Sequence, residues 1–262
     1  MNRLSIGAAW EETLAFVKRE GTLLFPVALL FLALPGVVLQ LLLPDSMHQT
    51  EPMKEISATS QLPPQFLLGM GVVILMAMLG ALALYALALR PGISVAEAIQ
   101  LAFRRLPVLI GSALLLVAGF IGIAIVLSLI GGIVAGVIGI GPAMSALVLV
   151  TVPILLFFSV RLILLNAVVL HEPVNSVEAI RRSWRLSAGL FWKLLGFIFV
   201  LLILVLVVQL VSQILFGIMG SVLGGSILGE LFAGLGVAVV SAIIQVYYLI
   251  MTCRIYRQLA ER

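Results

Sequence analysis

Residues 175–193 read NSVEAIRRSWRLSAGLFWK, a basic and aromatic segment between two long apolar runs. Asn175 and Glu178 have the spacing of a capping box, in which each side chain accepts a hydrogen bond from the other residue's backbone N–H. The segment therefore predicts a short helix that begins at Asn175. Weaker copies of it precede the other apolar runs of the chain.

The predicted helix has an apolar face and basic faces beside it. Val177, Ile180 and Trp184 share the apolar face by their spacing. The arginines on the neighbouring faces are Arg181, Arg182 and Arg185. Glu178 precedes Arg182 by four residues, so we expect an ion pair between them. Such a helix lies in the membrane interface, where it either anchors the chain or contacts lipid phosphate.

Composition places the chain in a membrane. It has 262 residues, of which 63% are hydrophobic and 10% charged, and its mean hydropathy is +1.30. About 25% of the residues in a soluble domain are charged, so this chain lacks the polar groups to cover a water-exposed surface. The net charge of +4 is small and the charges flank apolar runs, so nucleic acid is not an expected partner. The single cysteine, Cys253, excludes an intrachain disulfide.

Four apolar runs give room for six membrane-spanning helices of about 20 residues each. Residues 23–43 and residues 66–89 predict one helix each. Residues 107–170 contain one charge, Arg161, and predict two helices joined by a glycine-rich turn. Residues 194–253 also contain one charge and predict two more helices.

Basic residues predict the orientation of these spans. Thirteen of the 15 lysines and arginines fall on one side, whereas Lys54 falls on the other and Arg161 lies within a span. The positive-inside rule assigns the side with the thirteen to the cytoplasm. Both termini are then cytoplasmic. The thirteen are Arg3, Lys18, Arg19, Arg90, Arg104, Arg105, Arg181, Arg182, Arg185, Lys193, Arg254, Arg257 and Arg262.

An internal repeat recurs at an offset of 81 residues. EAIQLAFR at residues 97–104 matches EAIRRSWR at residues 178–185. Ser94 precedes the first of these by the spacing of a capping box with Glu97. A fainter copy is Ala15-Phe16, which stands before two basic residues. Each copy is followed by two predicted spans, a pattern typical of a repeated structural unit.

The predicted fold is an all-α integral membrane protein with six transmembrane helices. They form three helical hairpins, each preceded by a cytoplasmic amphipathic interfacial helix. The chain is a single membrane domain, residues 1–262, with internal units of about 1–91, 92–172 and 173–262. The outer segment, residues 44–64, is polar and contains several prolines, so it predicts an exposed loop.

Arg161 is costly in an apolar run, because arginine at the centre of a bilayer costs about 2.5–3.5 kcal/mol on insertion scales. No acidic residue in the same span is placed to pair with it. Two alternatives stay open. Arg161 snorkels to the cytoplasmic interface, with residues 162–170 along the membrane surface, or it binds a phosphate in a pocket between helices.

Other polar and small residues within the spans also have two interpretations. Gln209, Gln213 and Gln245 either form hydrogen bonds between helices or line a polar path for a solute. The small residues with i, i+4 spacing predict close helix packing; they are Gly132, Gly136, Gly225, Gly229 and Ala233. The sequence Gly-Ile-Gly-Pro at residues 139–142 predicts a break before the fourth span.

Catalytic motifs are absent from the sequence. It contains no H-E-x-x-H metal motif, no Walker-type phosphate loop and no G-x-S-x-G elbow. The adjacent pair His171-Glu172 is explained by a helix boundary before Pro173. We therefore expect a non-enzymatic protein without cofactor or metal, with an intramembrane enzyme that follows no such motif as the alternative.

Residues 169–192, VLHEPVNSVEAIRRSWRLSAGLFW, resemble the signature of the membrane domain of glycerophosphoryl diester phosphodiesterases and of the related YciC-like bacterial membrane proteins. The resemblance implies a bacterial inner-membrane protein linked to lipid or envelope homeostasis. The catalytic barrel of the phosphodiesterases has no counterpart here, so their hydrolytic activity is not implied. The matching positions are Arg161, Glu172, Ala179, Ser183, Trp184, Leu186, Phe191 and Trp192.

Three functions are consistent with these features. The first is a protein that recognises or moves lipids at the inner leaflet, with anionic lipids as partners and Trp184 at the interface. Its expected phosphate contacts are Arg161, Arg181, Arg182 and Arg185. The second is a small-solute transporter or channel lined by the three glutamines. The third is an assembly scaffold, or a homo-oligomer, that packs through its glycine-rich helix faces.

Overall fold

The computed structural model describes residues 5–41, 64–90, 92–222 and 227–260. The described residues form α-helices and one π-helical turn, without a β-strand. Six helical segments among them are long and apolar enough to cross a membrane. The predictions of an all-α chain and of six such helices are confirmed. The six segments are Ile6–Val38, Leu67–Leu89, Val95–Ile138, Ile140–His171, Phe191–Val222 and Leu231–Ala260.

The first segment is continuous from the amphipathic start of the chain into the apolar run. It comprises α1 (Ile6–Ala28), a π-helical turn η1 (Leu29–Ala33) and α2 (Leu34–Leu41). Ser5 caps α1 by accepting a hydrogen bond from the backbone N–H of Ala8. Within residues 5–41 the predicted interfacial helix and the first span are therefore one continuous helical segment. The predicted loop at residues 44–63 and Lys54 lie outside the described residues.

The second and third segments are α4 (Pro64–Leu89) and α5 (Val95–Ile138). The capping box at the start of α5 is confirmed. The Glu97 carboxylate accepts from the Ser94 backbone N–H at 2.8 Å, and Ser94 Oγ accepts from the Glu97 N–H at 3.3 Å. Pro107 lies inside α5, which continues through it. The expected short helix and the following span are therefore one helix here, because a single proline removes only one backbone hydrogen bond.

The fourth span follows a break at Gly139, whose φ of 89° favours glycine. This confirms the break predicted for residues 139–142. The span is α6 (Ile140–Leu162), and a short turn joins it to α7 (Leu165–His171). The remaining helices are α8 (Ser176–Leu186), α9 (Phe191–Val222) and α10 (Ile227–Ala260).

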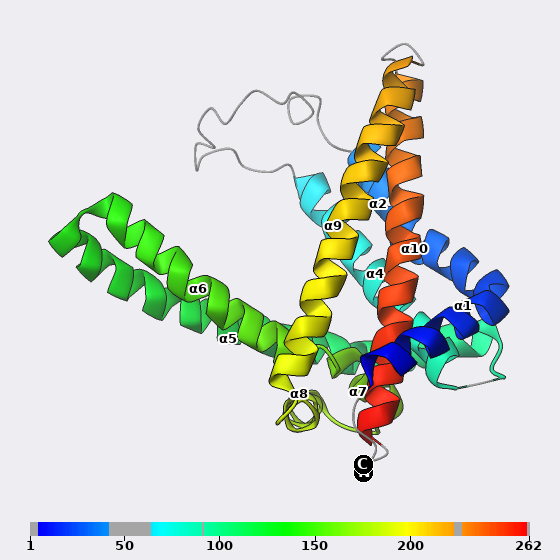
Figure 1. Ribbon diagram of the computed structural model, residues 1–262, viewed down its shortest axis with the longest axis horizontal. Helices are drawn as coiled ribbons and strands as arrows, with labels where there is room; N and C mark the ends of the chain where they lie inside the picture. Colours follow the sequence, from blue (N-terminus) through cyan, green and yellow to red (C-terminus); the bar gives the residue numbers. More distant parts are fainter. Residues whose placement is uncertain (1–4, 42–63, 91, 223–226, 261–262) are drawn as a thin grey trace.

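The tightly packed core lies at one end of the molecule, which we call the base. Two hydrogen bonds between Ser5 and Gln258 place the start of α1 beside the end of α10 there. Figure 1 shows α7, α8 and the C-terminus together at this end. The largest fully buried side chains are Leu24, Leu82, Leu84, Tyr85, Val160, Leu164, Val168, Leu170, Leu194, Ile250, Ile255 and Tyr256.

Two pairs of long helices extend away from the base. α5 packs along α6, and α9 packs along α10. The two pairs point in different directions in Figure 1. Away from the base their apolar side chains are exposed, for example Val137, Leu149 and Leu206. Exposed apolar surface of this extent requires a lipid-like environment or a partner.

Small residues allow close helix packing at one of the two predicted places. A Cβ added to Gly220 would lie 2.7 Å from the Gly229 carbonyl oxygen and 3.1 Å from Ala233 Cβ. α9 and α10 therefore approach closely there, as predicted for Gly229 and Ala233. Gly225 lies outside the described residues. For Gly132 and Gly136 the prediction is wrong within this chain, because an added Cβ would meet nothing within 4 Å.

Candidate functional site

The segment after Arg161 is buried in the core of the base. α7 is mostly apolar, with five of its seven residues buried, which is the pattern of a buried helix rather than an interfacial one. It packs against α4, α5, α8 and α10. The expectation that residues 162–170 lie along the membrane surface is therefore wrong. The buried residues of α7 are Leu165, Ala167, Val168, Val169 and Leu170.

α8 docks on the protein through small residues. Ala179 and Ser183 are fully buried, whereas Val177 is 56% exposed. The exposed Val177 is consistent with an apolar face turned toward a membrane, a prediction that the structure does not test, whereas the small residues make the contact with the protein. Ile180 and Trp184 flank the packed face and are half-buried. Small side chains occupy the packed face because they let the α8 backbone approach α5, α6 and α7.

One contact fixes the start of α8 against the middle of α5. Ser176 Oγ donates a hydrogen bond to the Val108 carbonyl oxygen at 3.0 Å. Gly111 provides the space, because a Cβ at this position would lie 2.5 Å from Ser176 Oγ. The Asn175 backbone N–H donates to the Glu178 carboxylate at 3.3 Å, so the Glu178 half of the predicted capping box is present.

Arg161 lies in the last turn of α6, beside α8. Its backbone carbonyl is one of those that a helix end leaves without an intrahelical donor. Ser183 Oγ donates to this carbonyl at 2.9 Å and so caps the end of α6. Ser187 Oγ lies 3.3 Å from the same carbonyl, but its single hydrogen has nearer acceptors in the carbonyls of Ser183 and Trp184, at 3.0 Å and 3.1 Å.

The Arg161 guanidinium is held by aromatic rings. Its central carbon lies 5.4 Å from the ring centroid of Phe157 and 5.2 Å from that of Trp184. Nη1 donates a long hydrogen bond, 3.4 Å, to the Trp184 carbonyl oxygen. A cation over aromatic faces gains about 0.5–2 kcal/mol. This geometry places the charge at the base and orients the plane of the guanidinium.

The Arg161 guanidinium also has an N–H group that donates to no acceptor among the described residues. Its Nε is buried and has no hydrogen-bond partner among the described residues, and Arg161 forms no ion pair with any of them. A buried donor without an acceptor costs about 1–3 kcal/mol. An anion could reach the half-buried Arg161 side chain only through its Nη atoms, where it would accept a charge-assisted hydrogen bond. The site can therefore bind an anion such as a phosphate group.

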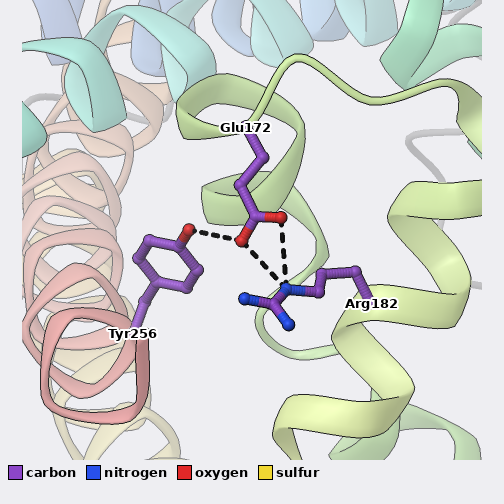
Figure 2. A network of polar contacts seen from close by, with 3 residues as sticks. All are labelled: Glu172, Arg182 and Tyr256. Atoms are coloured by element: carbon purple, nitrogen blue, oxygen red, sulfur yellow. Dashed lines mark hydrogen bonds and ion pairs between the residues drawn. The ribbon is translucent and has the colours of Figure 1, made fainter. Parts of the chain in front are cut away.

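Arg182, by contrast, is already paired. Its Nε lies 3.1 Å and 3.2 Å from the two carboxylate oxygens of Glu172, and Tyr256 donates its hydroxyl to Glu172 at 3.0 Å (Figure 2). The contact ties α8 to the residue that follows α7 and to the end of α10. The predicted Glu178–Arg182 ion pair is wrong, because the Glu172 carboxylate takes this guanidinium. Arg182 is the one of the four expected phosphate contacts that already has a carboxylate.

The remaining basic residues of this region are open to the surroundings. Arg181 and Arg185 are exposed on the outer face of α8, one helical turn apart. Trp192, at the start of α9, is 80% exposed. Exposed tryptophan is typical of a surface at the level of lipid headgroups.

A second arginine has similar surroundings at the end of α10. The Arg254 guanidinium carbon lies 4.8 Å from the ring centroid of Phe16 in α1. Its Nε is also buried without a partner among the described residues. The sequence around Arg254 is locally similar to that around Arg161. Both guanidinium groups lie over an aromatic ring of another helix at the base.

The three glutamines do not surround a common cavity. Gln209 accepts a hydrogen bond from Ser241 Oγ at 3.0 Å, which links α9 to α10. Gln213 and Gln245 are exposed. Gln209 thus has the interhelix role.

Sequence reasoning identified Arg161 and Trp184 but assigned no contact to three other residues of the base. Glu172 had been explained by a helix boundary, and Ser187 and Tyr256 had no assigned role. Glu172 and Tyr256 are 84 residues apart in the sequence, so no local pattern could have indicated their contact. A signal for Ser187 existed, because Ser183 and Ser187 have the i, i+4 spacing of one helical face.

Comparison of the chain with family models, with curated proteins and with solved structures finds no match in any of the three. The resemblance of residues 169–192 to the phosphodiesterase membrane domain therefore stays a prediction.

Proposed function

We propose that the protein is a non-enzymatic, multi-pass protein of the bacterial inner membrane that binds anionic lipid headgroups at the cytoplasmic leaflet. Arg161 would contact the phosphate, with Arg181 and Arg185 beside it on the exposed face of α8. The observation that carries the proposal is the Arg161 guanidinium, oriented by Phe157 and Trp184 and left with a buried donor that has no acceptor among the described residues.

Arg182 belongs to the structural part of this site. Its ion pair with Glu172 fixes α8 at the base, so we remove it from the phosphate contacts. The exposed apolar helices α5, α6 and α9 favour a lipid surrounding, and the exposed Trp192 favours an interface at the level of the base. Headgroups of the nearer leaflet would then meet Arg181 and Arg185 directly.

The proposal includes a topology of three hairpins with both termini in the cytoplasm. The Ser5–Gln258 hydrogen bonds support termini on one side. The base also contains the cations at the ends of α6 and α10 and those of α8, which the positive-inside rule assigns to the cytoplasm.

Three similar helix starts support internal units. The cap residues Ser5, Ser94 and Asn175 each accept a backbone hydrogen bond from a fully buried alanine four residues later. Four residues further on, each helix has another fully buried small residue: Thr13, Ala102 and Ser183. Counted from the cap residue, Thr13 rather than Ala15 corresponds to Ala102. This alignment of the first repeat copy differs by two residues from the one based on the sequence match.

Binding of phosphatidylglycerol to the purified full-length protein tests the proposal. Removing one charge-assisted contact should weaken binding about tenfold, so we expect this for Arg161→Gln. Arg104→Gln is the matched control. Arg104 is exposed on α5, and its substitution removes the same charge. Both variants should keep the unfolding temperature of a folded protein. Equal affinities of wild type and Arg161→Gln would contradict the proposal.

A further inference from the structure

A groove runs along α1 on the side that faces α10. It has a volume of about 760 Å³, which is in the range of small-molecule sites. One stripe of α1, spaced by three and four residues, forms its floor, and one tyrosine of α10 forms its wall. The lining side chains that matter here are Leu14, Val17, Lys18, Thr22, Phe25 and Tyr247.

Lys18 is the charged residue among those that line the groove. It forms no ion pair among the described residues, whereas its neighbour Arg19 pairs with Glu20 at 2.9 Å and stands over the ring of Phe16. The Lys18 ammonium is thus the cation available to a ligand in the groove. A ligand with an anionic group would complement this exposed charge.

Thr22 offers an acceptor next to that cation. Residue 26 is a proline inside α1, and proline has no N–H to donate to the carbonyl four residues earlier. The Thr22 carbonyl therefore lacks its ordinary helical donor, and the Thr22 side chain is exposed beside it. An acceptor of this kind favours a ligand that carries hydroxyl donors as well as an anionic group.

The rest of the groove suits a hydrocarbon chain. A Cβ on Gly21 would lie 3.0 Å from the Phe25 ring, so glycine lets this ring lie flat along the helix. Tyr247 is held in place by Trp10, with ring centroids 6.3 Å apart. Leu14 and Leu23 are exposed nearby. The groove thus has one charged side chain, Lys18, among apolar side chains that continue into the first span.

We infer that this groove is a second lipid site, which binds an anionic phospholipid with hydroxyl groups in its headgroup, as in phosphatidylglycerol. The phosphate lies at Lys18, a headgroup hydroxyl donates to the Thr22 carbonyl, and an acyl chain lies against Val17 and Phe25. The site is separate from Arg161 and does not depend on it, since α6 and α8 contribute nothing to the groove.

Cysteine labelling of the full-length protein can locate such a lipid. Leu14→Cys places a thiol at the rim of the groove, and Leu30→Cys places one on η1, where the side chain is exposed but does not line it. The native Cys253 is buried, so the unmodified protein provides the background. In detergent, phosphatidylglycerol should slow maleimide labelling at Leu14→Cys and leave Leu30→Cys unchanged.

Lys18 variants decide whether the charge acts as inferred. Lys18→Gln in the Leu14→Cys protein should raise the lipid concentration needed for protection about fivefold, and Lys18→Arg should restore it. Phosphatidic acid, which lacks the headgroup hydroxyls, should protect less well. Arg161→Gln should leave this protection unchanged, so failure of the Arg161 site and failure of the groove are distinguishable.

Three results would overturn the inference. They are equal protection by phosphatidylcholine, equal protection by water-soluble glycerol phosphate, and protection that Lys18→Gln does not alter. The first would show a groove without charge selectivity, and the second a site for a free anion.

Discussion

The Ser183 hydroxyl donates a hydrogen bond to the Arg161 backbone carbonyl at 2.9 Å. This contact joins the buried face of α8 to the end of α6. It is made to the backbone of the same residue whose guanidinium we assign to lipid. The position of α8 and the geometry of the anion site are therefore coupled. Changes that move α8 should alter both stability and lipid binding.

Ser183→Ala removes this donor and leaves the Arg161 carbonyl with the longer Ser187 contact. We expect a loss of about 1 kcal/mol in the free energy of unfolding, the usual contribution of one hydrogen bond. Thermal unfolding in detergent measures it. Ser128→Ala is the control, because the Ser128 hydroxyl is exposed and bonds only within its own helix. A Ser183→Ala protein no less stable than Ser128→Ala would show that the contact contributes nothing.

The Glu172, Arg182 and Tyr256 contacts should behave as one network. Glu172→Gln removes the charge that Arg182 pairs with, and we expect it to cost about 1.5–3 kcal/mol. Tyr256→Phe removes a single hydrogen bond and should cost about 1 kcal/mol. The double variant should cost less than the sum, because both changes act on the same carboxylate. Strict additivity in unfolding measurements would contradict the network of Figure 2.

Gly111→Ala should displace α8 from α5. The added Cβ would lie 2.5 Å from Ser176 Oγ, and overpacking of this kind costs about 1–3 kcal/mol. Gly119→Ala, in the same helix, has nothing within 4 Å of its added Cβ and should be neutral or stabilising. Combining Gly111→Ala with Ser176→Ala should recover part of the loss. Equal effects of the two alanine substitutions on the unfolding temperature would exclude the close approach.

Local physics allowed much of the fold to be predicted. The six apolar segments, the capping box at Ser94 and the break at Gly139 each depend on residues near one another in the sequence, and all three are present. The continuity of α5 through Pro107 was missed, because the cost of one proline is small against the burial of the flanking residues. The burial of α7 was missed for a different reason. Its position within the core depends on α4 and α10, which are distant in the sequence.

The candidate site was predicted in part. Arg161 was singled out because a lone arginine in an apolar run needs an explanation, and Trp184 because it lies beside arginines. The ion pair of Arg182 was assigned to the wrong acid, since helical spacing favours Glu178 whereas the chain turn after α7 brings Glu172 closer. The face of α8 that contacts the protein was not predicted. Hydrophobic spacing indicated only the face toward the membrane, whereas the small Ala179 and Ser183 are the fully buried residues.

Fluorescence of Trp184 tests the central claim most directly, because this ring lies against the Arg161 guanidinium. Trp10→Phe and Trp192→Phe leave Trp184 as the single tryptophan of the full-length protein. We predict that phosphatidylglycerol with brominated acyl chains quenches Trp184 more strongly than brominated phosphatidylcholine. Arg161→Gln should abolish this preference, and Arg104→Gln should keep it. Equal quenching by the two lipids in the protein that retains Arg161 would contradict anionic-lipid binding at this site.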